Sequence, residues 1–371
     1  MPWEELLSGL LHFTPGQGLM MLIGGVLIYL AINKGAEPVL LLPIGLGIIL
    51  ANIPLSGMHE EGGIFWLLKK AGLETEVFPL FIFIGIGAMI DFGSLLERPY
   101  TVLLGAAAQF GIFGTMLLAI VVGFPLNEAA AIGIIGSADG PTSIYVASIL
   151  APSRLGAVAV AAYSYMALVP IIQPPIMRLL TTKAERKIRM PTATTSVSRT
   201  TRIMFPIVAV VVTGLLVPKA TPLIGMLMFG NLLRESGVVT RLAHTAENEL
   251  VNIVTILLGI TVGSTMTAAT FLRADTILIF VLGIVAFSLG TATGVVFGKV
   301  MCYLSGRRVN PLIGAAGISA FPMSARVVQK VGLQADPHNH LLMHAVGANT
   351  AGQIASVVAG GALLALMAGI L

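Results

Sequence analysis

The sequence predicts an all-α polytopic membrane protein made of two inverted repeats, and three observations support this. Hydrophobic residues make up 56% of the 371 residues and charged residues only 10%, against roughly 25% in soluble domains. The hydrophobic residues gather in long runs. A polar, basic segment divides these runs into two sets that follow the same order. Because a chain this apolar cannot cover itself with polar surface, lipid must be its solvent.

The runs define the expected elements in chain order. The first repeat, residues 1–181, has runs near residues 18–33, 38–53, 76–96, 100–124, 128–150 and 156–181. Residues 182–202 form the basic linker. The second repeat, residues 203–371, has runs near residues 203–218, 221–235, 249–270, 275–304, 309–332 and 340–370.

Matching residues indicate that the halves arose by duplication. At an offset of 181, IGIIGSADGPTSIYV (132–146) lies over IGAAGISAFPMSARV (313–327), and Ile44-Gly45 lies over Ile224-Gly225 at a nearby offset. Each match is weak because apolar segments often match by chance. The matches nevertheless occur in the same order in both halves, which is typical of an internal repeat.

The fifth run of each half contains glycine, proline and polar residues at its centre. We expect residues 128–150 and 309–332 to be re-entrant hairpins of two half-helices that do not cross the membrane. About five crossings then remain in each half, and an odd number inverts the second half. With the linker in the cytoplasm, 15 of the 21 Lys and Arg residues lie on or beside cytoplasmic loops. This distribution follows the positive-inside rule.

Oppositely inserted hairpins should meet near the bilayer midplane and build a site there. Non-helical backbone at that depth is tolerated only inside protein or trapped water. The first hairpin carries Asp139 in GSADGPTSIY, with hydroxyl groups at Ser137, Thr142 and Ser143. A carboxylate costs roughly 2.5–3.5 kcal/mol at membrane depth, and among oxygen atoms it suits a hard cation. The alternatives are a cation or proton site and a carboxylate that merely turns a loop at the surface.

The second hairpin is chemically different. Its equivalent of Asp139 is Ala320, and Arg326 stands where the first hairpin has Tyr145. Arg326 is either an anchor that reaches the cytoplasmic interface or a fixed positive charge for an anionic substrate. Asn310 and Ser319 add polar groups to the same hairpin.

The sixth run of each half adds further polar groups. Asn349 is favoured as a cation ligand, and Tyr165 lies deep enough in its run to reach the site. Three histidines, His338, His340 and His344, open the last run, but histidines at a membrane edge are more often solvated than metal-bound. Asp91 is a second carboxylate within an apolar segment, paired by the repeat with Thr267, and we expect it at a helix N-terminus or in a contact between helices.

Several function classes are excluded by missing motifs. GVVFGKV (294–300) lacks the spacing of a phosphate-binding loop and the Ser or Thr that follows its lysine. The basic residues concentrate in one loop, so the pI of about 9.3 does not imply nucleic acid.

Four segments carry a resemblance to a known family: GSADGPTSIY, YSYMALVPIIQPPIMRLLTT, NPLIGAAGISAFPMSARV and GANTAGQIASVVAGG. They resemble the β subunit of the sodium-translocating, biotin-dependent decarboxylases. The resemblance implies a carboxybiotin decarboxylase of the bacterial inner (plasma) membrane. A biotin carrier protein would bring carboxybiotin from a carboxyltransferase α subunit, and decarboxylation would drive Na+ outward. A small membrane γ/δ subunit and a homo-oligomer within the complex are also implied.

The resemblance assigns roles by motif. It implies that Asp139 is the Na+ and proton site, with Asn310, Gly314, Ser319 and Asn349 around it, and that Ser319 is also catalytic. It implies that Tyr165 and Arg326 handle the proton and engage carboxybiotin. The compact chain favours a CoA-ester decarboxylase, for methylmalonyl-CoA or glutaconyl-CoA, over an oxaloacetate enzyme. The rival interpretation is a secondary Na+-coupled carboxylate transporter that works without a biotin protein.

Overall fold

The computed structural model describes residues 7–35, 37–191 and 197–369, and every regular element within these ranges is helical. The predicted all-α membrane fold is confirmed. Seven helices in the described ranges are long and apolar enough to cross a membrane, and an eighth is formed if a pair bent by 59° counts as one span. The chain termini and part of the basic linker (1–6, 192–196 and 370–371) lie outside the described residues.

The first half contains α-helices, one π-helix (η1) and two short 3-10 helices (η2 and η3). In order they are α2 (Ser8–Leu11), α3 (Pro15–Lys34), α4 (Pro38–Ala51), α5 (Ile64–Leu68), η1 (Lys69–Leu73), α6 (Val77–Met89), α7 (Gly93–Glu97), α8 (Thr101–Ala108), α9 (Phe110–Val122), α10 (Leu126–Gly133), η2 (Ile134–Ser137), α11 (Gly140–Leu150), η3 (Pro152–Arg154) and α12 (Leu155–Leu180).

One short helix of the linker, α13 (Lys183–Arg186), precedes the second half. The second half has α-helices, two 3-10 helices (η4 and η6) and one π-helix (η5). In order they are α14 (Arg199–Leu216), η4 (Pro218–Ala220), α15 (Thr221–Ser236), α16 (Thr240–Thr245), η5 (Ala246–Leu250), α17 (Val251–Ser264), α18 (Ala268–Phe271), α19 (Ala274–Leu304), η6 (Pro311–Gly317), α20 (Met323–Ala335) and α21 (Leu342–Ala368).

Helix boundaries follow local signals in the sequence, as α3 illustrates. Thr14 and Gln17 form a capping box, in which each side chain accepts from the other's backbone N–H. Pro15 opens the helix, where its missing N–H has no partner to lose. Gly35 ends it with a φ of 62°, a conformation that glycine adopts without strain.

Two of the ten expected crossings are too short to span the membrane as straight helices. α4 has 14 residues and α15 has 16. At about 1.5 Å per residue these helices are shorter than the roughly 30 Å thickness of the hydrocarbon core. Full-length crossings are therefore found for α3, α8–α9, α12, α14, α16–α17, α19 and α21, and the bent pair α5–α6 adds one more.

The two halves repeat the same order of elements, down to local irregularities. Each third crossing contains a π-helical turn, η1 in the first half and η5 in the second. Each is followed by a short helix, α7 or α18. A long crossing and a broken hairpin then follow in each half.

Helices of the first half pack against helices of the second half, in pairs that the repeat makes equivalent. α4 contacts α17 and α6 contacts α15, while α12 contacts α19 and α21 contacts α8. Glycines allow the closest crossings. A Cβ on Gly87 would lie 1.8 Å from the Leu227 carbonyl oxygen, and one on Gly230 would lie 1.8 Å from that of Ile84. The halves are therefore interleaved.

Two asparagines make equivalent contacts between the halves. Asn52, after α4, donates to the Met266 carbonyl oxygen (2.9 Å), and Asn231 on α15 donates to that of Ile90 (3.0 Å). Each acceptor lies just beyond the end of a partner helix, α17 or α6. The asparagines thus satisfy carbonyl groups that a helix end leaves without an internal partner.

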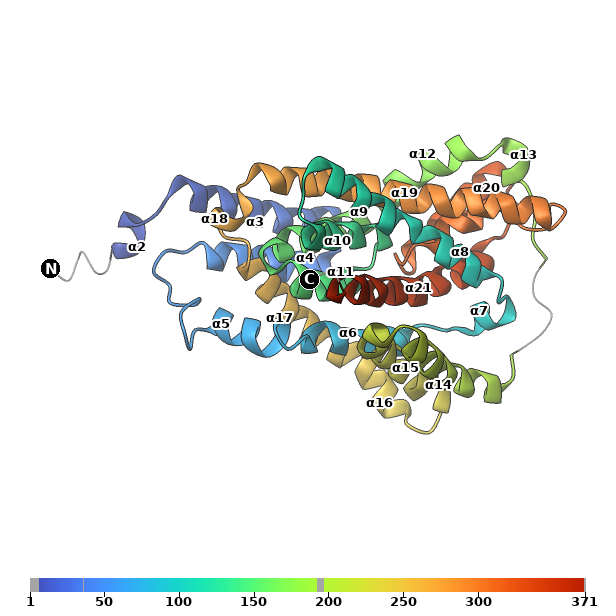
Figure 1. The fold of residues 1–371 in the computed structure, drawn as a ribbon, viewed down its shortest axis with the longest axis horizontal. Helices are drawn as coiled ribbons and strands as arrows, with labels where there is room; N and C mark the ends of the chain where they lie inside the picture. Colours follow the sequence, from blue (N-terminus) through green and yellow to red (C-terminus); the bar gives the residue numbers. More distant parts are fainter. Residues whose placement is uncertain (1–6, 36, 192–196, 370–371) are drawn as a thin grey trace.

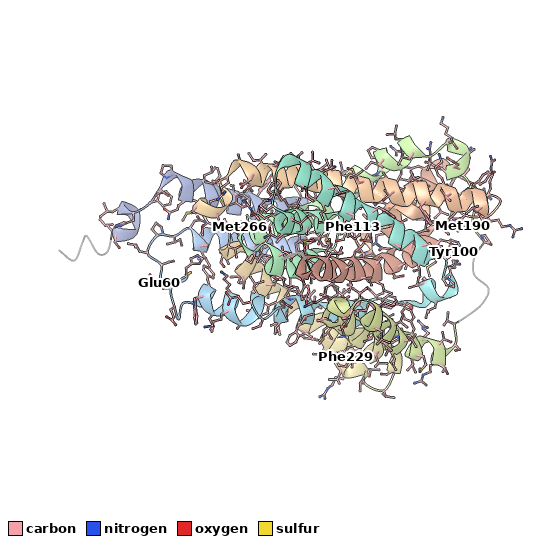
Figure 2. The ribbon with its side chains drawn as sticks, in the orientation of Figure 1. Glu60, Tyr100, Phe113, Met190, Phe229 and Met266 are labelled. Carbon is pink, nitrogen blue, oxygen red and sulfur yellow. The ribbon has the colours of Figure 1, made fainter. Side chains whose placement is uncertain are left out.

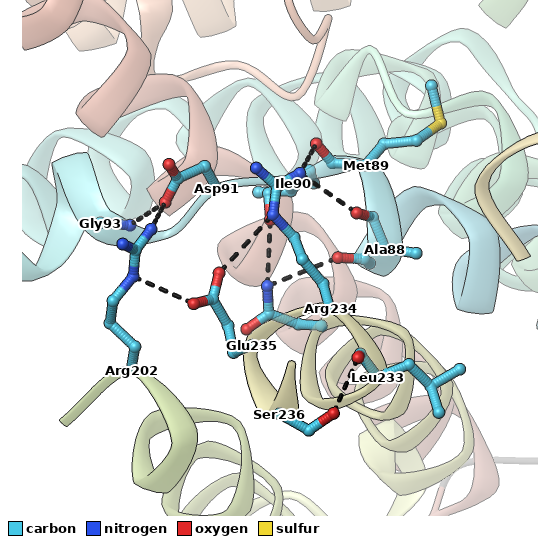
Figure 3. Close-up of polar contacts among 12 residues, drawn as sticks. Ala88, Met89, Ile90, Asp91, Gly93, Arg202, Leu233, Arg234, Glu235 and Ser236 are labelled. Carbon is cyan, nitrogen blue, oxygen red and sulfur yellow. Dashed lines mark hydrogen bonds and ion pairs between the residues drawn. The ribbon is translucent and has the colours of Figure 1, made fainter. Parts of the chain in front are cut away.

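Figure 3 shows the ion pairs that join the segment between α6 and α7 to α14 and α15. Arg202 lies 2.8 Å from Asp91 and 3.0 Å from Glu235. Asp91 also accepts from the Gly93 N–H at the start of α7 (2.8 Å). Both expected roles of Asp91, at a helix start and between helices, are confirmed.

The broken hairpins lie within a group of long helices. α9 and α19 contact η2, and α8, α19 and α21 contact η6. α21 runs along the middle of the molecule, while α13 and α20 lie at one end and α2 and α5 at the other (Figure 1). Met190 of the linker lies at the end with α13 and α20 (Figure 2). Side chains fill the space between these helices.

Candidate functional site

Both predicted hairpins are broken at their centres. The first unwinds after η2, where Ala138 takes a φ of 54° and Asp139 becomes the N-cap of α11. Pro141 follows within the first turn, where its lack of an N–H costs nothing. The second hairpin unwinds between η6 and α20, around Ser319. Each break leaves backbone N–H and C=O groups that need partners.

The tips of the two hairpins meet, as predicted. The Ser319 N–H donates to the Ser137 carbonyl oxygen at 2.9 Å. Asp139, two residues beyond Ser137, is 3% exposed. The interpretation of Asp139 as a surface loop residue is therefore wrong, because the second hairpin and α21 cover it.

The Asp139 carboxyl group has two donors. The Thr142 N–H donates to Oδ1 (3.1 Å), and the Ser356 hydroxyl of α21 donates to Oδ2 (2.6 Å). The first contact is a helix N-cap, and the second joins the first hairpin to the last helix. Among the described residues these are its two hydrogen-bond donors, so the buried carboxyl group retains lone pairs that can bind a cation.

One face of α21 supplies the surrounding polar groups. Asn349, Gln353 and Ser356 are spaced by four and then three residues, so they lie on the same side of the helix. The Asn349 amide donates to the carbonyl oxygens of Ala316 (3.2 Å) and Ile318 (2.7 Å). The Gln353 amide donates to the Ser319 carbonyl oxygen. This face therefore satisfies the backbone of the second hairpin.

Several buried oxygen atoms around the hairpins have no hydrogen-bond partner among the described residues. The amide groups of the affected side chains point their N–H atoms at backbone carbonyls, which leaves their oxygens unpaired. These amide oxygens are Asn349 Oδ1, Gln353 Oε1, Gln109 Oε1 and Gln173 Oε1, and the hydroxyl oxygen Thr142 Oγ1 is unpaired as well. Each unpaired buried polar atom costs about 1–3 kcal/mol, and a bound cation or water would remove that cost.

The donor set suits a hard monovalent cation better than a transition metal. One carboxylate and neutral oxygens offer little charge and no soft ligand. Within residues 7–35, 37–191 and 197–369, no three His, Cys, Asp or Glu side chains gather as a metal site. His338 and His340 are exposed, and His338 lies 3.6 Å from Asp336, whereas His344 is buried in α21. The expectation that these histidines are solvated is therefore wrong for His344.

The predicted residues Ser319 and Gly314 both lie at the second hairpin, in different roles. The Ser319 hydroxyl donates to the Gly352 carbonyl oxygen of α21 (2.8 Å). Gly314 lies against α19, where a Cβ would come within 2.0 Å of the Gly294 carbonyl oxygen. Gly314 therefore allows close packing of η6 on α19.

Asn310 and Tyr165 have partners away from Asp139. Asn310 donates to the carbonyl oxygens of Arg186 (3.2 Å) and Ile188 (2.8 Å) in the linker, and its own oxygen caps η6 through the Leu312 N–H (3.0 Å). The Tyr165 hydroxyl donates to the Phe280 carbonyl oxygen of α19. Arg326 lies on the exposed face of α20.

Two residues that lie beside Asp139, Ser356 and Tyr163, were not among the site residues predicted from the sequence. Ser356 bonds to Asp139 directly, and its spacing from Asn349 is a helical signal that points to it. Tyr163 lies against Gly140, because a Cβ there would come within 2.1 Å of the ring carbon Cζ. Tyr163 and Tyr165 differ by about 200° around a helix, and the sequence contains no signal for choosing between them.

Comparisons with known proteins place the chain in a family. The sequence model of a family described as the Na+-transporting oxaloacetate decarboxylase beta subunit matches residues 16–367. The chain is 56% identical over 362 residues to the glutaconyl-CoA decarboxylase subunit beta of Acidaminococcus fermentans, covering 98% of this chain and 96% of that protein.

Two further relatives are named for other substrates. The chain is 55% identical over 360 residues to the methylmalonyl-CoA decarboxylase subunit beta of Veillonella parvula, covering 97% of this chain and 95% of the relative. It is 48% identical over 417 aligned positions to the oxaloacetate decarboxylase beta chain 2 of Salmonella typhi, covering 96% of each. The chain therefore belongs to the family of Na+-transporting decarboxylase β subunits, multi-pass proteins of the bacterial membrane that work as parts of multi-subunit complexes.

Proposed function

We propose that this chain decarboxylates carboxybiotin, presented on the cytoplasmic side by a biotin carrier protein, and couples that reaction to outward Na+ transport. The observation that carries the proposal is the Asp139 carboxyl group, buried where the two hairpin tips meet and hydrogen-bonded to Ser356. Moving one charge against the membrane potential costs about 2.3 kcal/mol per 100 mV. Membership of the decarboxylase family indicates that decarboxylation provides this energy.

The reaction consumes one proton. The bond between the biotin nitrogen and the carboxylate breaks, CO2 leaves, and the nitrogen takes up a proton. In this proposal Na+ binds at Asp139 and lowers its affinity for a proton, because a positive charge beside a carboxylate favours the ionised form. The released proton completes the decarboxylation, while Arg326 holds the carboxylate of carboxybiotin as a charge-assisted partner.

The Na+ ligands we propose are the Asp139 carboxylate with Ser319 and with the unpaired oxygens of Asn349, Gln353 and Thr142. The carboxyl group is buried at the tip contact, and the oxygens of Asn349, Gln353 and Thr142 are buried without hydrogen-bond partners in the described part of the chain. Asn310 and Gly314 contribute indirectly, by holding η6 against the linker and against α19. This replaces the direct ligation that the resemblance implies for these two residues.

Alternating access would come from the repeat. We propose that residues 1–181 and 203–371 are inverted repeats and that the hairpins with their surrounding helices move against the remaining helices, as inverted-repeat transporters do. The shared order of elements and the reciprocal contacts between halves support this.

The soluble substrate we propose is a CoA ester. The relatives named for glutaconyl-CoA and methylmalonyl-CoA are 56% and 55% identical, against 48% for the oxaloacetate relative, whose alignment is also longer. The partners are a carboxyltransferase α subunit, the carrier protein and a small membrane γ/δ subunit, and the β subunit is a homo-oligomer in the complex.

Reconstitution with the carboxylated carrier in sealed vesicles tests the proposal. We expect CO2 release to require Na+ and to accompany Na+ uptake, and Asp139→Asn to abolish both. Asp91→Asn is the matched control, because Asp91 is also a carboxylate of the first half but pairs with Arg202. Na+-independent CO2 release, or a fully active Asp139→Asn variant, would contradict the proposed coupling.

A further inference from the structure

A basic cavity lies at the end of the molecule that carries α13 and α20. It has a volume of about 490 Å3 and lies between the last turn of α12, the linker helix α13 and the C-terminal turns of α20. Four cations line it and no carboxylate does. The lining residues are Arg178, Lys183, Arg186, Lys187, Val331, Gln334 and Ala335. We call this feature the basic pocket.

Neutral groups hold the arginines of the basic pocket, so their charge is not compensated. Arg178 donates to the Gln334 side-chain oxygen (2.7 Å). Arg186 donates to the Arg178 carbonyl oxygen (3.2 Å) and to the Thr181 hydroxyl (3.1 Å). A guanidinium fixed by neutral acceptors keeps its full attraction for an anion.

The carboxylates next to the lining residues in the sequence, Glu185 and Asp336, have other partners. Glu185 accepts from the Thr182 N–H (2.6 Å) and lies 3.5 Å from Lys299. Asp336 lies 2.8 Å from Arg189. Four positive charges therefore face one cavity without an acidic group, which is an unfavourable arrangement unless an anion binds there.

The backbone of the basic pocket is held from inside the protein. Two buried side chains, Asn310 and Asn339, both donate to the Arg186 carbonyl oxygen, at 3.2 and 2.8 Å. Asn310 also donates to the Ile188 carbonyl oxygen (2.8 Å). The linker at this point is thus a fixed part of the fold, and its cations are positioned in advance.

A polar stripe on α20 leads from the basic pocket toward the hairpin tip. Arg326, Lys330 and Gln334 are all exposed and four residues apart, so they lie on one face of the helix. Gln334 lines the basic pocket and Arg326 lies in the first turn after the tip. The distance between them along the helix is about 12 Å at 1.5 Å per residue.

We propose that the basic pocket is where the carboxylated biotin arm of the carrier protein first binds, and that the stripe guides its carboxylate from there to Arg326. This inference rests on the proposed function. A binding site for an anionic lipid headgroup would also use such cations. The stripe favours the arm, because its charges continue toward the hairpin tip.

The test measures the rate of CO2 release against the concentration of carboxylated carrier, in the reconstituted complex. We expect Lys183→Gln with Lys187→Gln to raise KM about ten-fold at low ionic strength, since surface charges steer association. The increase should shrink at about 0.5 M salt, where charges are screened beyond roughly 4 Å. The kcat and the Na+ concentration for half-maximal rate should stay unchanged.

Two further variants make the result specific. Lys330→Gln, in the middle of the stripe, should also raise KM. The control Lys34→Gln with Arg241→Gln removes two positive charges elsewhere and should leave KM unchanged. Melting temperatures check that all variants fold.

Each alternative outcome overturns the inference in a recognisable way. An unchanged KM in the pocket variant, with an active wild type, would show that the arm binds elsewhere while the proposed function stands. If native mass spectrometry shows that the pocket variant has lost phosphatidylglycerol that copurifies with the wild type, and its KM is unchanged, the basic pocket is a lipid site. A wild-type complex that releases no CO2 from carboxylated carrier would instead refute the proposed function itself.

Discussion

Asp139 is stabilised at its buried position by groups from both halves of the chain. A hydrogen bond to a charged group contributes about 1.5–3 kcal/mol, so the Thr142 and Ser356 donors together offset a cost of roughly 2.5–3.5 kcal/mol for burying a carboxylate in a membrane protein. The Thr142 contact is local, whereas the Ser356 contact joins residues 217 positions apart. Removing Ser356 should therefore affect the site without unfolding the hairpin.

We expect Ser356→Ala to weaken Na+ binding by about ten- to a hundred-fold, because one charge-assisted hydrogen bond is lost. The measurement is the Na+ concentration that gives half-maximal CO2 release. Ser148→Ala is the matched control, since Ser148 donates only to the Tyr145 carbonyl oxygen (2.8 Å) on α11. Equal Na+ affinity in both variants would remove Ser356 from the site.

The two tyrosines of α12 should behave differently. Tyr163 lies against Gly140, next to Asp139, while Tyr165 donates to α19. We expect Tyr163→Phe to change the Na+ dependence and pH profile of CO2 release. Tyr165→Phe should lower stability by about 1 kcal/mol, seen as a lower melting temperature with the Na+ dependence retained. The opposite pattern would assign the proton-handling role to Tyr165.

At the scale of single elements, side chains of the second half attach the linker to the rest of the protein. Asn310 and Asn339 hold its backbone, and Asp336 holds Arg189. The pKa of Asp336 is lowered to about 2, mainly by the hydrogen bond from the Arg189 side chain and to a smaller extent by that from the His338 N–H. Because the folded-state pKa is lowered, this carboxylate stabilises the attached linker above its ordinary pKa and loses that effect as the pH falls toward 2.

Hydrogen exchange of residues 186–191 tests this pH dependence. After correction for intrinsic exchange rates, we expect protection to be constant from pH 7 to pH 5 and to fall between about pH 4 and pH 2. Asp336→Asn should show reduced protection already at neutral pH. Glu128→Gln should not, since Glu128 pairs with Arg154. Unchanged protection in Asp336→Asn would mean that the asparagines alone hold the linker.

At the scale of the whole molecule, the fold depends on close crossings between helices of opposite halves. Gly87 and Gly230 lie against backbone carbonyls of the partner helix. Such small residues let membrane helices approach without a hydrophobic driving force between them. The interleaving makes each half incomplete without the other.

Two glycines on α15 provide a matched test of this packing. A Cβ on Gly230 would lie 1.8 Å from the Ile84 carbonyl oxygen, whereas one on Gly225 would meet nothing within 4 Å. We expect Gly230→Ala to destabilise the protein by about 1–3 kcal/mol or more. Gly225→Ala should be neutral or stabilising by up to about 1 kcal/mol. Melting temperatures in detergent measure both, and similar values would argue against this crossing.

The all-α membrane class, the broken hairpins and the meeting of their tips could be predicted from the sequence. Membrane burial requires long apolar runs, and unwound backbone inside a membrane requires glycine, proline and polar side chains at recognisable positions. Asp139 was identifiable for the same reason, because a carboxylate within such a run is costly unless it has partners. These signals are local, so they can be recognised in a single sequence without knowledge of the tertiary structure.

Only the tertiary structure decided which distant side chains reach Asp139. Ser356 and Tyr163 contact the first hairpin because α21 and α12 are rotated to face it, while Asn310 and Tyr165 face the linker and α19. Helix rotation is set by packing against all neighbours together, and apolar runs that are hydrophobic on every side do not encode it. The basic pocket likewise exists only because the end of α20 lies beside α13.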